Sequence, residues 1–318
     1  MQVTTQPWMH MLSVPQPPAP PSFGSVFGPA SPATGEAPAH AEAEKASSPP
    51  RESIGVSPVV QAFLLRLQEL GMASLAGTDG ADTLKGWSSS LADAGSGDDS
   101  VDVWSNSVVD AGDGDDSVRA WSDSAVYGGN GDDQIDVWSG SVADGGGGDD
   151  VIRAWSDTAV AGGDGDDAID AWSNSKVDGG SGNDRISAWS NSVVDGGDGD
   201  DVIQAHAGSV VTGGRGNDTI VVRSDSVVRF SSGDGQDTIH AGTDTKIQLG
   251  QDMAAERTRV EIAGNTATIR FDDSADTLTV HLRAGNPASL SFADGTTLSL
   301  VGEPIRSELG APPVLKAL

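Results

Sequence analysis

The chain has no cysteine, few aromatic residues and no long hydrophobic run, and each absence excludes a class of protein. Because none of its 318 residues is Cys, disulfide frameworks and thiolate metal sites are excluded. Aromatic residues make up 5% and hydrophobic residues 36% of the chain, which is too lean for a large enzyme with a thick core. No run of 18 apolar residues occurs, so we expect no membrane-spanning helix.

Basic residues are also scarce. The chain has 18 Lys and Arg against 47 Asp and Glu, which gives a formal net charge of −29. This charge would repel a phosphate backbone, so it argues against binding to nucleic acid. The first twenty residues carry several prolines and no basic cluster, and we therefore expect no cleaved secretory signal there.

Composition divides the chain into four segments. Residues 1–56 contain 11 of the 16 Pro and no periodic apolar face, and we predict that they are disordered. Residues 57–75 are predicted to be an amphipathic helical cap, with the helix over about 58–71. Residues 76–242 contain 31 Gly and 32 Asp but no Glu and no Pro.

Ordinary strand patterns return in the fourth segment, residues 243–318. Apolar and β-branched residues alternate in four stretches, at 260–262, 268–271, 278–282 and 290–292, and an Asp294-Gly295 turn follows them. We predict a C-terminal β cap here that also carries a secretion signal.

Residues 76–242 form an internal repeat with a period of 17 residues. The repeat is clearest in seven tryptophans that are spaced 17 residues apart without exception: Trp87, Trp104, Trp121, Trp138, Trp155, Trp172 and Trp189. His206 and Arg223 continue this column, whereas the motif around His240 has shifted by two residues. Two short strands and two tight turns in each period are typical of a β-solenoid.

Side-chain alternation within the repeat identifies the interior of the solenoid. One column is aliphatic in every repeat, from Leu84 through Ile169 to Ile220, and a second strand supplies another aliphatic column from Val109 to Val228. We therefore predict an all-β fold. It is a parallel β-roll (β-solenoid) of about ten 17-residue coils, with a short N-terminal helical cap and a β-rich C-terminal cap.

One outward column alternates in the sign of its charge. It reads Asp102, Arg119, Asp136, Arg153 and Asp170 in successive repeats. In a parallel stack with coils about 4.8 Å apart, each of these charges would face an opposite charge in the next coil. We interpret the column as setting the register of the stack rather than as a binding site.

The two turns of each repeat differ in chemistry. One reads Ser-Asn/Asp/Gly-Ser, and we interpret it as structural because its central residue tolerates the left-handed conformation of a tight turn. The other reads Gly-Gly-x-Gly-x-Asp, as around Asp133 and Asp201. Stacking would align its sixth-position carboxylates about 5 Å apart, where they repel one another unless a cation is present. Hard oxygen ligands in flexible loops favour calcium over zinc or copper.

This turn and the apolar residue after it resemble the repeats-in-toxin (RTX) family, also called hemolysin-type calcium-binding repeats, whose signature is Gly-Gly-x-Gly-x-Asp-x-apolar-x. The resemblance covers about half the chain. It implies several calcium ions, each held between successive turns by loop carbonyls and sixth-position carboxylates. Because the other half of each repeat has no such ligands, we expect one column of ions on one edge. The implied ligands are Asp82, Asp99, Asp116, Asp133, Asp150, Asp167, Asp184, Asp201, Asp218 and Asp237.

Calcium would then act as a switch for folding. Residues 76–242 carry 32 Asp against 8 Lys or Arg, a net charge of −24, and self-repulsion should expand them when calcium is low. Binding to the folded state alone would drive folding. The resemblance also implies type I export of an unfolded chain through an uncleaved C-terminal signal. We predict a secreted, extracellular calcium-binding protein with a structural or matrix role.

The tryptophan column points away from the aliphatic interior and should form an apolar strip on one edge. One interpretation is structural, because stacked rings would lock the register of the coils or mediate self-association. The other is a binding face for a glycan, a lipid or another protein, since exposed apolar strips often mark interaction sites. Both interpretations stay open, and the seven tryptophans are candidate ligand-binding residues.

The sequence contains no pattern that predicts an enzyme. The His-Glu-x-x-His motif of zinc proteases and the Gly-x-Ser-x-Gly elbow of lipases are both absent. We therefore predict a non-enzymatic protein. The alternative functions are a surface-recognition module that uses the tryptophan ladder and, as a weaker alternative, an effector injected into a host, which the Pro- and Ser-rich N-terminal segment suggests.

Overall fold

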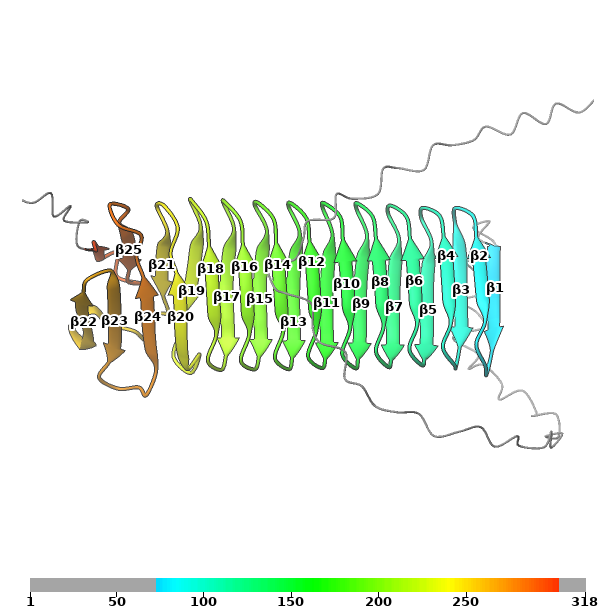
Figure 1. Cartoon of the computed structure of the whole chain (residues 1–318), viewed down its shortest axis with the longest axis horizontal. Helices are drawn as coiled ribbons and strands as arrows, with labels where there is room; N and C mark the ends of the chain where they lie inside the picture. The colour runs from blue at the N-terminus through cyan, green and yellow to red at the C-terminus, as the bar shows by residue number, and fades with distance from the viewer. Residues whose placement is uncertain (1–72, 303–318) are drawn as a thin grey trace, which may run out of the picture. The chain divides into compact units, whose positions relative to one another are not determined.

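A computed structural model describes residues 73–302, which form a solenoid of two facing parallel sheets (Figure 1). Each 17-residue repeat contributes one strand to each sheet, so the strands alternate between the sheets along the chain. Neighbouring coils pair in parallel and in register, as in the pairing of Ile152 with Ile169. The predicted fold, a parallel β-roll of about ten coils, is confirmed.

Each sheet has thirteen strands. The first sheet consists, in spatial order, of β1 (Ala73–Thr78), β3 (Ser90–Gly95), β5 (Val108–Asp113), β7 (Ala125–Asn130), β9 (Val142–Gly147), β11 (Ala159–Asp164), β13 (Lys176–Ser181), β15 (Val193–Asp198), β17 (Val210–Arg215), β19 (Val227–Phe230), β21 (Lys246–Leu249), β25 (Ala288–Ser291) and β26 (Thr297–Leu300).

The second sheet lies opposite the first. It consists of β2 (Thr83–Gly86), β4 (Ser100–Val103), β6 (Ser117–Ala120), β8 (Gln134–Val137), β10 (Val151–Ala154), β12 (Ala168–Ala171), β14 (Arg185–Ala188), β16 (Val202–Ala205), β18 (Thr219–Val222), β20 (Gln236–His240), β24 (Thr277–His281), β23 (Thr266–Phe271) and β22 (Thr258–Ala263). A single 3₁₀ turn, η1 (Ala255–Arg257), is the one helical element of the described residues.

The core is a thin layer between the two sheets. The column that the sequence placed inside is fully buried, as at Ile135, Ile169 and Ile203, and so is the Val109 column of the first sheet. Small side chains such as Ala154 and Ala171 fill the remaining inward positions. Because the core is only two side chains thick, each coil is stabilised mainly by the coils on either side of it.

The alternating charge column lies on the outer face of the second sheet. Asp136 forms ion pairs with Arg119 at 3.9 Å and with Arg153 at 3.5 Å, one in each neighbouring coil. The predicted register of these charges is therefore confirmed.

Parallel pairing continues beyond residue 242. Strand β20 pairs with β24, and β21 pairs with β25, before the antiparallel strands β23, β22 and β26 close the stack. The four predicted C-terminal strand regions fall in β22, β23, β24 and β25, whereas β26 had no matching prediction. How the chain divides into domains stays a prediction.

The predicted helix over about 58–71 lies outside the described residues, as does the predicted disordered segment. Residues 73–75 belonged to the predicted helical cap, and this part of the prediction is wrong because they begin strand β1. Leu75 pairs with Ala92 of the next coil, so this stretch extends the stack instead of ending a helix. No helix in the described part of the chain is long and apolar enough to cross a membrane.

Candidate functional site

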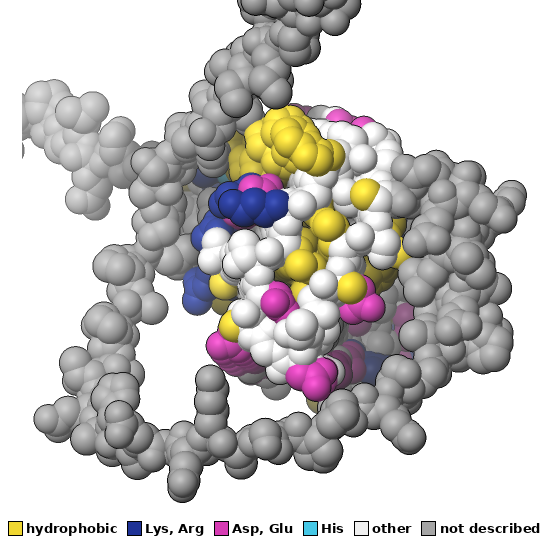
Figure 2. Space-filling model, turned by 90° about the vertical axis from the view of Figure 1, so that its right-hand side faces the viewer, with side chains coloured by type: hydrophobic (Ala, Val, Ile, Leu, Met, Phe, Trp, Pro, Cys, Tyr) yellow, Lys and Arg dark blue, Asp and Glu magenta, His cyan; other side chains and the backbone are white. Residues whose placement is uncertain are grey.

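The two edges of the roll carry different chemistry. Viewed along the stack from its β1 end, hydrophobic side chains gather at one edge and acidic side chains at the opposite edge (Figure 2). The acidic edge is built from the Gly-Gly-x-Gly-x-Asp turns, and the hydrophobic edge is built from the tryptophan turns.

The acidic edge depends on glycine at two positions of each turn. The second and fourth residues, such as Gly163 and Gly165, have φ angles of 125° and 136°, in a region that side chains with a Cβ rarely adopt. A Cβ on Gly163 would also overlap with the carbonyl oxygen of Gly146 in the preceding coil. The glycines therefore allow successive turns to stack backbone against backbone.

The sixth-position aspartates form a buried column along this edge. From Asp99 to Asp237, all nine are at most 3% exposed. One oxygen of each carboxylate serves the fold, because Oδ1 accepts a hydrogen bond from the backbone N–H of the aspartate one coil earlier. Asp133 accepts from Asp116 at 2.8 Å, and Asp167 accepts from Asp150 at 2.8 Å.

The second oxygen of these carboxylates has no partner. Oδ2 is buried and accepts no hydrogen bond in eight consecutive coils, at Asp99, Asp116, Asp133, Asp150, Asp167, Asp184, Asp201 and Asp218. A buried carboxylate oxygen without a donor is costly, and native proteins normally satisfy such an atom with a proton, a donor or a cation.

A backbone carbonyl lies beside each unpartnered oxygen in the central coils. A Cβ on Gly128 would overlap both with Oδ2 of Asp133 and with the carbonyl oxygen of Gly145 in the next coil. The same arrangement recurs one coil later, around Gly145, Asp150 and the carbonyl of Gly162. Carboxylate and carbonyl oxygens thus converge between successive turns, which is the ligand chemistry that calcium prefers.

The electrostatics of the aspartate column favour carboxyl groups that are either protonated or neutralised by a bound cation. Burial, with a smaller contribution from carboxylates of adjacent coils, raises the pKa of Asp133, Asp150, Asp167 and Asp201 to about 7. The same causes raise the pKa of Asp237 to about 8. A bound cation would reverse this effect, because it stabilises the ionised form.

Side chains alone do not complete a metal site here. In residues 73–302, no three His, Asp or Glu side chains converge closely enough to hold an ion. Any ion must therefore take backbone carbonyls together with one or two carboxylates. The residues present fit calcium, which accepts six to eight oxygen ligands of mixed type, better than they fit zinc.

The ends of the column differ from its middle. In the first coil, Oδ2 of Asp82 is partnered, because it accepts hydrogen bonds from the backbone N–H and the hydroxyl of Thr78 at 2.6 and 2.8 Å. At the other end, Asp237 stacks on Asp218 across a 19-residue coil, through a hydrogen bond of 3.1 Å. The ten predicted ligands are thus collected on one edge, but the first of them is already engaged within its own turn.

The structure adds an acidic residue, Asp276, that no sequence motif marks. Asp276, in the loop before β24, is 8% exposed, and its Oδ2 accepts a hydrogen bond from the backbone N–H of Gly233 at 2.8 Å. It lies close enough to Asp234 and Asp237 to raise the pKa of both, after the larger effect of burial. Asp276 therefore extends the acidic edge beyond the last Gly-rich turn.

The opposite edge carries the seven tryptophans as a continuous stack. Centroids of neighbouring rings lie 4.6 to 6.3 Å apart, and the planes differ by at most 26°. His206 extends the stack at 4.6 Å from Trp189. The first ring, Trp87, is 78% exposed, and the other six are half-buried by their neighbours. The predicted outward strip is therefore present.

A ladder of buried hydroxyls supports this tryptophan edge. Ser107 donates to the carbonyl of Trp104 at 2.6 Å, and its backbone N–H donates to the hydroxyl of Ser124 in the next coil at 3.2 Å. The central turn residues, such as Asn106 and Asp123, have φ angles near 60°. Both observations agree with the structural role predicted for the Ser-Asn/Asp/Gly-Ser turn.

Comparison with known families matches three stretches of the chain. The model of the RTX calcium-binding nonapeptide repeat (4 copies) matches residues 122–141, 173–192 and 188–220. A comparison with curated proteins finds no match. Among solved structures, the chain is similar to the extracellular lipase LipA from Serratia marcescens, with 16% identity and a TM-score of 0.27. This similarity covers 53% of the chain and 38% of the lipase, so the chain spans well under half of the lipase's length.

Proposed function

Because the chain carries RTX calcium-binding nonapeptide repeats, we propose that its acidic edge holds a column of calcium ions and that this column folds the roll outside the cell. The chain is a calcium-binding β-roll protein, and repeats of this kind are typical of secreted bacterial proteins. The finer proposal assigns the sixth-position aspartates as ligands and gives the folded roll a structural or matrix role without catalysis.

The unpartnered Oδ2 atoms carry this proposal. Eight carboxylate oxygens in consecutive coils are buried and accept no hydrogen bond. A bound Ca²⁺ supplies positive charge and accepts these oxygens together with loop carbonyls as ligands. The eight aspartates from Asp99 to Asp218 would hold the ions, whereas Asp82 would have to release Thr78 first.

The chain's own residues explain why folding should depend on the ion. At neutral pH the unfolded chain keeps its aspartates ionised and hydrated, and the net charge of −24 on residues 76–242 expands it. Folding without calcium would bury this column of like charges. A ligand that binds only the folded state shifts the equilibrium toward it by mass action.

Circular dichroism and calorimetry during a calcium titration test the proposal. We expect the metal-stripped full chain to change from coil to β structure as calcium rises, with a much weaker response to magnesium. Asp150→Asn should raise the calcium concentration at the midpoint severalfold. Asp157→Asn is the matched control, since it removes the same charge at the tryptophan edge, where Asn174 occupies the equivalent turn position. A metal-stripped chain that is equally folded and heat-resistant would contradict the proposal.

Surface recognition by the tryptophan edge is the second candidate. It is favoured by the length of the stack and by the exposure of Trp87, since a long aromatic strip at the surface is a common feature of interaction sites. Replacing Trp121 and Trp138 by Ala should abolish binding to glycan arrays or liposomes if this function is correct. Loss of thermal stability without any loss of binding would support the structural role instead.

A further inference from the structure

Beyond the aromatic stack, the tryptophan column contains a glycine, Gly242, in one coil. Ile220 pairs with Ile239, and Ile239 pairs with Val280, so the residues three places later in each coil occupy the tryptophan column. These residues are Arg223, Gly242 and Arg283. After seven Trp, one His and one Arg, the column has a glycine, and arginines occupy the positions on both sides of it.

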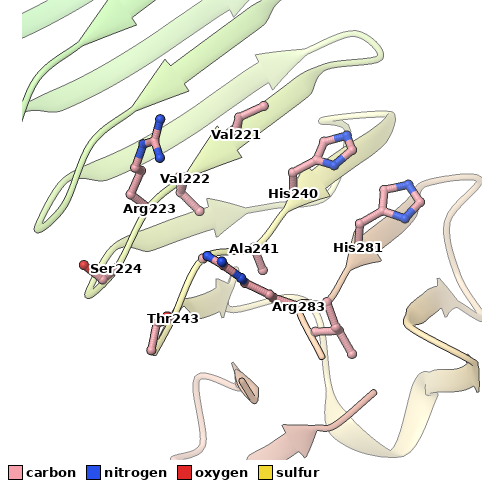
Figure 3. A pocket seen from close by; sticks show the side chains of 11 residues that line it. Val221, Val222, Arg223, Ser224, His240, Ala241, Thr243, His281 and Arg283 are labelled. Atoms are coloured by element: carbon pink, nitrogen blue, oxygen red, sulfur yellow. The ribbon is translucent and has the colours of Figure 1, made fainter. Parts of the chain in front are cut away.

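A hollow of about 560 Å³ lies at this position, which is within the usual size range of small-ligand sites. It opens beside the stacked imidazoles of His240 and His281, whose centroids are 4.7 Å apart (Figure 3). Glycine is required at position 242 by close backbone packing, because a Cβ there would lie 2.5 Å from the carbonyl carbon of Arg223. The polar side chains that line it are Arg223, Ser224, His240, Thr243, His281 and Arg283.

The hollow is lined by positive charge, whereas the chain as a whole is strongly negative. The whole chain carries −29, yet two arginines and no acidic residue line this site. Among the described residues, neither Arg223 nor Arg283 forms an ion pair, whereas six other arginines pair with Asp or Glu at 3.9 Å or less. The two arginines lie two coil spacings apart, about 10 Å along the stack, with the coil of Gly242 between them, so a ligand over Gly242 would lie one coil from each arginine.

We propose that this hollow binds an oxyanion group, a carboxylate or a sulfate, held between Arg223 and Arg283. Guanidinium groups recognise such anions through paired, charge-assisted hydrogen bonds. Ser224 and Thr243 add hydroxyl donors at the same edge, and the stacked histidines form one wall. The anion comes either from solution or from a larger acidic molecule that continues along the tryptophan edge.

Isothermal titration calorimetry on the calcium-loaded full chain tests this site. The probes are sodium sulfate, a uronic acid disaccharide and a neutral disaccharide of the same size. We expect the anionic probes to bind and the neutral disaccharide to bind at least tenfold more weakly. A uronate that binds tenfold more tightly than sulfate identifies the larger acidic molecule as the source, and equal affinities identify the free anion.

Three variants separate a specific site from general attraction to positive charge. Arg223→Gln and Arg283→Gln should each weaken anion binding at least tenfold. Arg229→Gln, on the outer face of the other sheet, makes the same change in charge and should leave the affinity within twofold. Equal losses in all three variants, or no anion binding by the unaltered chain, would overturn the proposal.

The calcium titration of the same variants keeps this inference distinct from the proposed function. None of the three arginines touches the acidic edge, so the calcium midpoint should stay unchanged in each variant. A calcium-independent fold that still binds anions through both arginines would contradict the calcium proposal alone.

Discussion

The sixth-position aspartate has a separate task for each of its two oxygens. Oδ1 of Asp167 accepts the backbone N–H of Asp150 and so fixes the stacking of one turn on the next. Oδ2 of the same carboxylate is buried without a partner. One side chain therefore links the backbone ladder to the candidate ion column, and asparagine could keep the first task while it weakens the second.

Acidity should partly replace calcium in folding the roll. In the calcium-free folded state the pKa of Asp133, Asp150, Asp167 and Asp201 is raised to about 7, against about 3.9 in an unfolded chain. A raised carboxyl pKa means that the folded state binds protons more tightly. The contribution of these carboxyls to the stability of the folded state is complete below about pH 4 and is lost as the pH rises through about 7. We expect metal-stripped protein to show more β structure by circular dichroism at pH 5.5 than at pH 8. Equal spectra at the two pH values would contradict the burial of these carboxyls.

Replacing the glycine at the second position of the acidic turn should destabilise the roll. Gly163→Ala places a Cβ at a φ of 125° and against the carbonyl of Gly146, which should cost about 1–3 kcal/mol from the backbone conformation alone. Thermal unfolding in saturating calcium measures the loss. Gly140→Asn is the control, because Gly140 has a φ of 77° at a turn position where other coils carry Asn, and its melting temperature should change little.

At the scale of strands, charge decides how one coil aligns with the next. On the second sheet the signs alternate, and Asp136 pairs with two arginines. On the first sheet Asp178 of β13 lies in register with Asp195 of β15, and burial followed by this neighbour raises the pKa of Asp195. An aspartate is thus favourable in the outer column of the second sheet and unfavourable in the outer column of the first sheet.

One substitution made in both columns should have opposite effects. Asp136→Arg replaces two attractive pairs by two repulsive ones and should destabilise the calcium-loaded roll by about 1–2 kcal/mol. Asp178→Arg removes a repulsion from Asp195 and should leave stability unchanged or slightly increased. Both effects should shrink in 1 M salt, where screening acts over about 3 Å. Denaturant unfolding of the two variants checks this, and equal losses would show that register does not depend on these charges.

At the scale of the whole molecule, the roll behaves as a one-dimensional stack. Each coil pairs only with the coils before and after it, so the two sheets extend side by side from β1 to β25 (Figure 1). In such a stack, stability is a sum of coil terms and neighbour terms. Damage in the middle interrupts two neighbour contacts, whereas damage near an end affects mainly the last coils.

The position of a lost ligand should therefore matter. Asp167→Asn, in the central coils, should raise the calcium midpoint of folding more than Asp99→Asn, near the first coil. Hydrogen exchange of the calcium-loaded variants should show exposure on both sides of residue 167 in the first case and only N-terminal fraying in the second. Identical exchange patterns in the two variants would contradict stepwise stacking and favour a single all-or-none unit.

The repeat made much of this structure predictable. A period of 17 residues with one aliphatic column in each strand requires parallel coils, since only that pairing buries Ile169 beside Ile152 and Ile186. The same period places the sixth-position aspartates on one edge and the seven tryptophans of the repeat on the other. The end regions were less predictable, because residues 73–75 join β1 and parallel pairing runs past residue 242 without the motif.

The sequence by itself determined the repeat and the inward columns, because these depend only on local spacing, and its resemblance to the RTX repeats supplied the candidate calcium ligands. Tertiary structure decided which atoms are left without partners. Only stacking reveals that Oδ1 of each aspartate is used by its neighbour while Oδ2 is not, and only stacking brings Asp276 to the acidic edge. Stacking also aligns Gly242 between Arg223 and Arg283. The 17-residue period could not show this alignment, because a two-residue insertion and the segment that forms β22 and β23 interrupt the period and leave the two arginines 60 positions apart.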